Sequence, residues 1–256
     1  MSDQTTLLID ADIVAYKAAA RNQQTFNFGT GNCHHIDEES ARRDVDAVIG
    51  EYCETLGSNK VIVCLTDPAV NFRKQLCSSY KSNRSKTEKP LLLNYIKGYL
   101  SEEYDCYLRE RLEADDVMGI LATHPTLING HTIIVSEDKD MRTIPADVYH
   151  PHRPENGVMS ISALDAHRFH MYQTIIGDPT DGYGGCPGVG KSSVYAEEVL
   201  GADQDELWDI VLEAYASKGL TEDDAILQAR FARILHARDY NFKTKKIKLW
   251  TPLCLV

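Results

Sequence analysis

Several features are absent from this sequence of 256 residues. It has no apolar run of about 18 residues, so we expect no transmembrane helix and no membrane partner. The polar start, residues 1–6, leads directly into an apolar run, whereas a secretory signal has a basic start and a longer apolar stretch. There is also no internal repeat and no low-complexity linker. These absences favour a cytoplasmic globular chain, whose 43% of hydrophobic residues can form a core.

Paired cysteine motifs are missing as well. The seven cysteines, at positions 33, 53, 64, 77, 106, 186 and 254, include no C-x-x-C pair. An odd, scattered set is typical of core thiols in a reducing compartment, not of a disulfide framework or a zinc site. The adjacent Cys33, His34 and His35 lack a second ligand pair, so we assign them to a polar loop.

Basic residues are fewer than acidic ones. The chain has 27 Lys and Arg against 38 Asp and Glu, a net charge of −11. This balance argues at first against a nucleic-acid partner. However, many acids stand in short clusters of the kind that bind divalent cations, and the basic residues are concentrated elsewhere.

Hydrophobic periodicity predicts strands that alternate with helices. We expect strands at 7–10, 61–65, 105–108 and 132–135, and helices at 13–20, 38–56, 91–100, 114–122 and 162–176. Residues 21–37 are rich in Gly, Asn, Gln and Thr and are predicted to be a loop. This alternation predicts an α/β fold with a mainly parallel central sheet and helices on both faces.

The last third of the chain differs from this core. Residues 221–224 (Thr-Glu-Asp-Asp) resemble a capping box before a helix that extends to about residue 236. We therefore predict a sheet-based core over residues 1–176, with a basic segment at about 71–100. Residues 177–256 are predicted to form a helical region.

Acidic residues follow the predicted strands. Asp10, Asp67 and Asp138 fall at or just after strand ends, where parallel sheets bind ligands. Nine carboxylates in five clusters would repel one another unless cations bind between them, and hard oxygen ligands select Mg²⁺ or Mn²⁺. Any single cluster could instead cap a helix or face solvent, as we expect for Asp12. The predicted metal-ligand set is Asp10, Asp67, Glu113, Asp115, Asp116, Asp138, Asp140, Asp178 and Asp181.

A basic segment follows Asp67. Between residues 72 and 89 it contains six cations against one acid, Glu88, with Phe72 and Tyr80 interleaved; the cations are Arg73, Lys74, Lys81, Arg84, Lys86 and Lys89. Cations for phosphates and aromatic rings for bases are the parts of a single-strand binding surface. The alternative interpretation is a solvated basic helix or loop. The position of the segment directly after Asp67 favours a surface that guides a phosphate chain into the acidic site.

Residues 185–192 match the P-loop pattern G-x-x-x-x-G-K-S. A P-loop requires an apolar strand immediately before the first glycine, whereas residues 177–184 are rich in Asp, Gly, Pro and Thr. The alternative is a helix-hairpin-helix turn, in which backbone groups hold a monovalent cation such as K⁺ and a DNA phosphate. In that interpretation Gly188, Gly190 and Lys191 contact substrate.

Two other functions are compatible with parts of the sequence. Residues 10–14 (Asp-Ala-Asp-Ile-Val) fit the start of haloacid-dehalogenase-type phosphatases, with Asp10 as the nucleophile. That interpretation leaves residues 113–116, the basic segment and the glycine turn without a role. The third alternative is a non-catalytic protein that binds DNA ends or junctions.

Taken together, these residues resemble the 5′-nuclease family of flap endonucleases and 5′-3′ exonucleases, and above all the exonucleases of short-tailed bacteriophages. The resemblance covers nearly the whole chain, with several motifs in the family's order. The matching segments are 8–10 (LID), 66–67 (TD) with 72–74 (FRK), 80–84 (YKSNR), 112–119 (LEADDVMG), 134–140 (IVSEDKD), 177–183 (GDPTDGY), 232–235 (ARIL), 240–242 (YNF) and 249–250 (LW).

The resemblance implies a PIN-like nuclease core, a basic arch and a helix-hairpin-helix that grips duplex DNA. It implies that Asp10, Asp67, Glu113 and Asp115 hold one ion, that Asp138, Asp140, Asp178 and Asp181 hold a second, and that Asp116 lies between them. Lys81 and Arg84 would contact the scissile phosphate as catalytic groups, and Arg73 and Tyr80 would also bind substrate. In many members the lysine of the glycine turn comes one residue later, where this chain has Ser192.

The implied partners are DNA with 5′ ends, flaps or nicks, together with RNA–DNA hybrids and replication proteins. The implied location is the host cytoplasm if a phage encodes the chain.

Overall fold

A six-stranded sheet forms the centre of the molecule. The structure is a computed structural model that describes residues 4–27, 29, 31–82 and 88–252. The strands are β1 (Thr5–Asp10), β2 (Gln23–Asn27), β3 (Asn32–Ile36), β4 (Lys60–Leu65), β5 (Cys106–Leu108), β6 (His131–Val135), β7 (Asp147–Tyr149), β8 (Val158–Ser160), β9 (Tyr240–Asn241) and β10 (Lys246–Ile247). The α-helices are α1 (Ala11–Arg21), α2 (Glu38–Leu56), α3 (Phe72–Leu76), α4 (Leu93–Glu103), α5 (Ala114–Thr123), α6 (Ala163–Ile176), α7 (Val194–Val199), α8 (Leu207–Ala216) and α9 (Glu222–Ala232).

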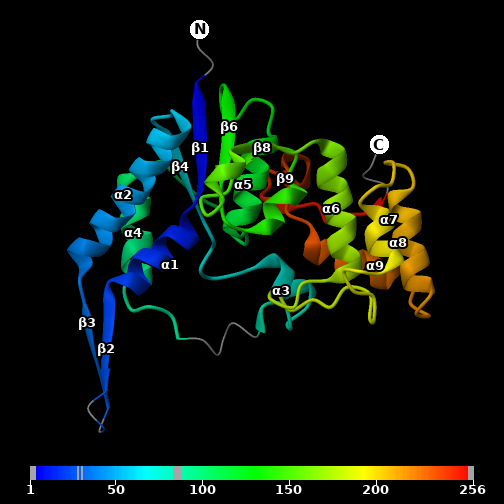
Figure 1. Cartoon of the computed structure of the whole chain (residues 1–256), viewed down its shortest axis with the longest axis horizontal. Helices are drawn as coiled ribbons and strands as arrows, with labels where there is room; N and C mark the ends of the chain where they lie inside the picture. Colours follow the sequence, from blue (N-terminus) through cyan, green and yellow to red (C-terminus); the bar gives the residue numbers. More distant parts are fainter. Residues whose placement is uncertain (1–3, 28, 30, 83–87, 253–256) are drawn as a thin grey trace.

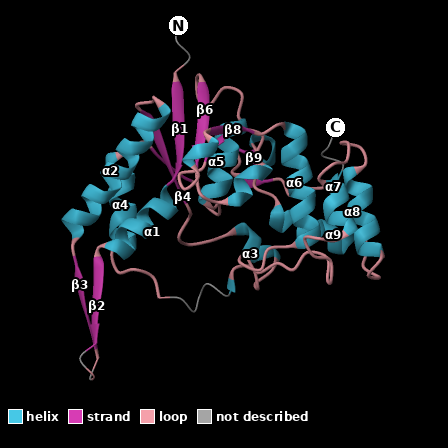
Figure 2. Ribbon diagram, viewed as in Figure 1, coloured by secondary structure: helices cyan, strands magenta, loops and turns pink. Residues whose placement is uncertain are grey.

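The sheet has the strand order β5-β4-β1-β6-β7-β8, in which β8 alone pairs antiparallel. Asp10 aligns with Cys64 of β4, and Ile9 aligns with Val135 of β6, so the three central strands end together. Residues that follow these strands therefore gather at one edge of the sheet, which lies at the start of α1 in Figures 1 and 2. This confirms the predicted parallel α/β core.

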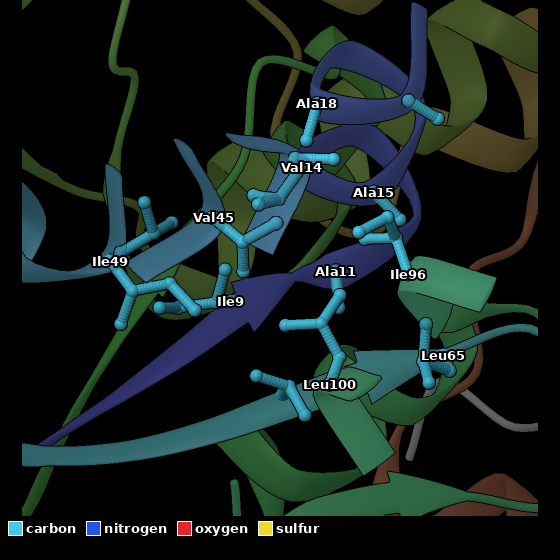
Figure 3. Close-up of a cluster of buried hydrophobic side chains, with 14 of the residues drawn as sticks. Ile9, Ala11, Val14, Ala15, Ala18, Val45, Ile49, Leu65, Ile96 and Leu100 are labelled. Carbon is cyan, nitrogen blue, oxygen red and sulfur yellow. The ribbon is translucent and has the colours of Figure 1, made fainter. Parts of the chain in front are cut away.

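Alternate residues of β1 face two separate hydrophobic clusters. Leu7 and Ile9 pack with α1, α2 and α4 on one face, and Leu8 packs with α5 on the other. Figure 3 shows the first cluster, where Ile9 of β1 lies among Val45, Ile49 and Leu100. Burial on both faces explains why β1 and β4 read as short apolar runs without alternation.

The helices toward the carboxyl end form their own core. Met171 and Ile175 of α6 pack with residues of α7, α8 and α9 and with Trp250. Helix α6 also contacts η2 (Lys139–Thr143), a 3₁₀ helix at the edge of the sheet. The predicted boundary at residue 176 therefore follows a helix, α6, that joins the sheet-based part to the helical part.

The prediction of a loop over residues 21–37 was wrong. Strands β2 and β3 form an antiparallel hairpin there, which projects from the body in Figure 1. Most of its described side chains are exposed on both faces, so no hydrophobic alternation marks it in the sequence. Cys33, His34 and His35 lie in β3, where the His34 Nδ1 is 2.9 Å from the Thr25 hydroxyl.

The helices that the structure describes include none with the length and apolar character of a membrane span.

The packing of α5 leads to a stability prediction. A Cβ added at Gly119 would lie 2.5 Å from the carbonyl oxygen of Leu235 and 2.9 Å from Cγ2 of Ile234. We expect Gly119→Ala to lower the free energy of unfolding by about 1–3 kcal/mol, as measured by urea denaturation. Gly98→Ala in α4 is the control, because a Cβ there meets no atom within 4 Å, and it should be neutral or stabilising. Equal effects of the two variants would contradict the proposed contact.

Candidate active site

Asp10 begins the acidic edge of the sheet. It is the last residue of β1 and the N-cap of α1, and it is buried. Its Oδ1 accepts a hydrogen bond from the Ile13 N–H at 3.4 Å, and its Oδ2 accepts one from the Ser136 hydroxyl at 2.9 Å. Ser136 directly follows β6, so the pair joins the ends of two adjacent strands. The carboxylate is thus fixed in position with few donors to compensate its charge.

Three further aspartates approach from the loops after β6 and α6. Asp138 caps η2 and accepts the Asp140 N–H at 2.9 Å. Asp140 in turn accepts the side-chain amide of Gln173 in α6 at 2.5 Å. Asp178, directly after α6, accepts the Thr180 N–H at 2.7 Å and contacts the ammonium group of Lys139. Side chains from two distant loops therefore face one another.

Burial and mutual repulsion alter the acid strengths of these groups. Burial, and then the charges of Asp12 and Asp138, raise the pKa of Asp10 to about 7. Burial and Asp138 likewise raise the pKa of Asp140 to about 7. Burial, Asp138 and Asp10 raise the pKa of Asp115 well above its usual range. Asp138 is thus the common neighbour of the other three carboxylates.

These oxygen donors fit a hard divalent ion. An open cavity of about 330 Å³ is lined by Asp138, Asp140, Asp178 and Asp181, among other residues. Within the described residues, no three His, Cys, Asp or Glu side chains already stand close enough to form a complete metal site. Lys139 supplies positive charge between Asp178 and Asp140 instead. Carboxylates without histidine or thiol ligands match Mg²⁺ or Mn²⁺, and such an ion would relieve the repulsion that raises the pKa values.

Arg73 occupies a buried position behind this edge. Its guanidinium donates to Glu113 Oε2 at 2.8 Å and to both oxygens of Asp116 at 2.8 Å. It also donates to the main-chain oxygens of Phe231 and Arg233. Arg73 is 2% exposed, so binding a substrate phosphate, as predicted from the sequence, would require these bonds to break. Its present contacts are structural.

Asp116 shares that structural environment. It is fully buried, and besides Arg73 it accepts the main-chain N–H groups of Glu113 and Leu235. Asp67 likewise accepts the N–H groups of Arg111 at 2.7 Å and Ala69 at 3.0 Å, which lower its pKa. Asp67 and Asp116 therefore each accept two main-chain N–H groups, and their assignment as metal ligands stays a prediction.

Lys81 reaches the acidic edge from the turn after α3. Its Nζ lies 2.5 Å from Glu113 Oε1 and 3.3 Å from Asp181 Oδ2. The main-chain N–H of Lys81 donates to the Asp181 carbonyl oxygen at 2.8 Å. Burial alone would raise the pKa of Glu113, but Lys81 and Arg73 outweigh it and hold that pKa at about 2. Lys81 adopts a left-handed φ of 52°, which is strained for a residue with a side chain. This strained turn aims an ammonium group into the site.

Tyr80 is directed inward beside Lys81. Its hydroxyl donates to Glu113 and Asp181 at 3.1 Å each, and its ring stacks on Phe231 with centroids 5.7 Å apart. The ring is 2% exposed, so stacking on a base, as predicted, would first require it to leave Phe231. Arg84, the other predicted catalytic cation, lies outside the described residues.

The glycine-rich segment lies between α6 and α7. Residues 177–184 form no strand apart from an isolated bridge between Asp178 and Tyr183, so the arrangement needed for a P-loop is absent from this described segment. Val189 is buried in the helical core, whereas Gly188, Gly190 and Lys191 are exposed. The turn thus presents backbone and a lysine to solvent between two helices.

Several site residues were not predicted from the sequence. Lys139 lies inside the Asp-Lys-Asp motif, so its contact with Asp178 had a local signal. Ser136 stands directly after β6, where it could have been considered. Gln173 had no such signal, because it comes from α6, 33 residues beyond its partner Asp140.

Comparisons with known proteins show which proteins this chain resembles. Residues 5–163 match the family described as "5′-3′ exonuclease, N-terminal resolvase-like domain". The chain is 31% identical to the exodeoxyribonuclease of Enterobacteria phage T3 and 30% identical to the exonuclease of Escherichia phage T7, in each case over 98% of this chain and 94% of the relative. The bacteriophage T5 D15 protein, co-crystallised with metal ions, has the same fold, with a TM-score of 0.62 at 14% identity over 90% of this chain and 89% of that one.

The buried contacts of Arg73 predict a large effect on stability. We expect Arg73→Met to lower the free energy of unfolding by about 3–5 kcal/mol, because it leaves the buried carboxylate of Asp116 without its ion-pair partner. Lys74→Met, at the exposed neighbouring position, should change it by less than about 0.5 kcal/mol. Thermal and urea denaturation would measure both. A stable Arg73→Met protein with impaired DNA binding would instead support a substrate contact.

The raised pKa of Asp10 predicts a pH dependence without metal. Because the folded-state value, about 7, exceeds the usual 3.8, this group stabilises the fold at low pH and loses that effect as pH rises through about 7. In a chelating buffer, the free energy of unfolding of Asp10→Asn minus that of the wild type should therefore rise by up to about 4 kcal/mol as the pH goes from 4 to 7. Asp165→Asn is the control, because the pKa of this exposed residue is lowered. A constant Asp10→Asn difference across this range would contradict the assignment.

Proposed function

Because this chain belongs to the 5′-3′ exonuclease family, we propose that its acidic edge hydrolyses DNA phosphodiesters at or near 5′ ends with two Mg²⁺ or Mn²⁺ ions. The observation that carries this proposal is the meeting of Asp10, Asp115 and Asp140 around Asp138, with their pKa values raised by burial and repulsion. Such crowding without a bound cation is unfavourable near neutral pH.

The carboxylates divide into two groups by position. Asp10 and Asp115, with Glu113, would hold one ion, and the second would be held by Asp138, Asp140, Asp178 and Asp181. Asp67 and Asp116, which were also predicted as ligands, would support this arrangement through their main-chain hydrogen bonds. When bound, the ions supply Lewis-acid charge that lowers the pKa of water and stabilises the phosphate.

Lys81 would act on the substrate directly. Its ammonium group is paired with Glu113 and Asp181 at the acidic edge, and these two carboxylates can turn toward metal when substrate arrives. Lys81 would then be free to stabilise negative charge on the scissile phosphate, a contribution that is large in a site shielded from water. We assign the same role to Arg84, by its place in the matching motif.

The exposed glycine turn would hold the DNA beyond the cut. Gly188, Gly190 and Lys191 offer main-chain groups and a cation to a phosphate, with K⁺ as the bridging ion. The substrates would be 5′ ends, nicks and flaps of DNA, with RNA–DNA hybrids as a second class. Replication proteins are the expected partners, in the cytoplasm of the host cell if the chain is phage-encoded.

Removing a carboxylate from the second group tests the metal assignment. We expect Asp138→Asn and Asp178→Asn each to lower the Mg²⁺-dependent cleavage rate by about 100-fold or more, while DNA binding in chelator stays near the wild-type level. Gel analysis of 5′- and 3′-labelled duplex and flap substrates would measure cleavage. Asp165→Asn, an exposed aspartate of α6, is the matched control and should cut normally.

Near wild-type cleavage by either site variant would overturn the assignment of these residues to the metal. The same assay with an RNA–DNA hybrid tests the second substrate class.

Duplex binding in KCl and in LiCl, measured for the wild type and for Lys191→Ala, tests the cation at the glycine turn. No dependence of duplex binding on K⁺ would count against that part of the proposal.

A further inference from the structure

A strongly basic hairpin lies away from the acidic edge. Residues 238–248 contain five cations, Arg238, Lys243, Lys245, Lys246 and Lys248, in a chain whose net charge is −11. The single acid in this stretch, Asp239, is buried and accepts two hydrogen bonds from Arg233. All five cations are exposed, and among the described residues no ion pair engages the four lysines. The hairpin therefore carries uncompensated positive charge.

Aromatic side chains stand beside these cations. Phe242 lies edge-on to both Tyr240 and His124, with ring centroids 5.2 Å apart in each case. Tyr240 is buried, but Phe242 remains 38% exposed. The two neighbours fix the ring of Phe242 and leave part of it open to solvent. A base could stack on that exposed surface.

Two adjoining cavities extend this surface. An open cavity of about 660 Å³ is lined by His124, Phe242 and Lys243, and a second of about 380 Å³ is lined by His167, Arg233 and His236. Arg238 borders both cavities. No carboxylate is among the residues that line either of them, in contrast to the cavity at the acidic edge.

This surface and the acidic edge lie at opposite ends of α5. Asp115 is in the first turn of α5, and Thr123, its last residue, lines both cavities. Ten residues of helix span about 15 Å, so the two sites are separate. Tyr240 of β9 belongs to the same hydrophobic cluster as Val117 and Leu121 of α5, on the face of the sheet that α5 covers, and Figure 1 shows β9 close to α5.

We propose that the β9–β10 hairpin and the cavities beside it bind single-stranded DNA, namely the strand left unpaired as its complement is removed. Lysines along a hairpin suit successive phosphates, and an exposed phenyl ring suits a base that has no pairing partner. The choice of DNA as the ligand rests on the proposed function. Lysine on a short edge ribbon can also block strand pairing, but that purpose requires neither arginine-bordered cavities nor an exposed ring.

Fluorescence anisotropy with labelled oligo-dT, in chelator so that no cleavage occurs, tests the charges. Each lysine that contacts a phosphate makes the fall of log affinity with log salt steeper by about 0.7 for single strands. The double variant Lys243→Gln with Lys246→Gln should therefore make this slope shallower by about 1.4. Arg43→Gln with Lys60→Gln removes two charges on α2 and β4 and should leave the slope unchanged. Lys245 is not substituted in this variant, because its φ of 55° lies in the left-handed region.

Phe242→Ala tests the bases. It should weaken oligo-dT binding about tenfold, yet leave binding of an abasic strand of equal length unchanged. Leu127→Ala, at an equally exposed apolar position, is the control. Retention of wild-type oligo-dT affinity and salt slope by the lysine and phenylalanine variants would overturn the proposal. So would equal losses for oligo-dT and blunt duplex, because they would indicate a duplex-binding surface.

The cleavage assay separates this inference from the proposed function. For the first cut on a short blunt duplex in Mg²⁺, before any complementary strand has been exposed, the hairpin variants should match the wild-type rate. A wild-type chain that cuts no DNA would refute the proposed function, whereas the binding measurements would still decide whether the hairpin holds single strands. An acidic peptide that binds the wild type but not the variants, with oligo-dT binding unaffected, would assign the surface to a protein partner instead.

Discussion

Repulsion among carboxylates at one edge of the sheet governs the chemistry of this molecule. Parallel strands that end in register bring Asp10 beside the segment that follows β6, and α5 and the turn after α6 add acids from two further directions. Burial, which removes the water that would otherwise solvate the charges, and then mutual repulsion keep three pKa values high. A divalent ion is the simplest partner for such a group, which is why the site and its cofactor have to be considered together.

Buried and exposed cations have different roles around this edge. Arg73 is enclosed and joins α3, α5 and the carboxyl end of α9 through bonds to Asp116, Phe231 and Arg233. Lys81 and Lys139, by contrast, have more accessible side chains, and each contacts two carboxylates of the acidic edge. A fixed cation thus holds the acids of α5 in place, and lysines on flexible stems can exchange partners when a phosphate enters.

Charge is separated along α5. Its amino end carries the acids of the sheet edge, and its carboxyl end lies beside cavities lined without any carboxylate. This arrangement explains how a chain of net charge −11 can have a nucleic-acid partner: the sign of the local field, and not the net charge, decides where a phosphate binds. The proposed function also gives roles to residues 113–116 and the glycine turn, which a phosphatase centred on Asp10 would leave unused.

The sequence by itself determined the parallel α/β core and the family, because buried strands, amphipathic helices and ordered motifs are local signals that survive without a structure. It could not reveal the β2–β3 hairpin, whose exposed faces carry no hydrophobic period, nor the partnership of Gln173 with Asp140 across 33 residues. It also divided nine acids between two ions without their protein partners. Only the tertiary structure showed that Asp67 accepts the Arg111 N–H and that Asp116 accepts the Leu235 N–H, because hydrogen-bond partners come from distant segments that only folding brings together.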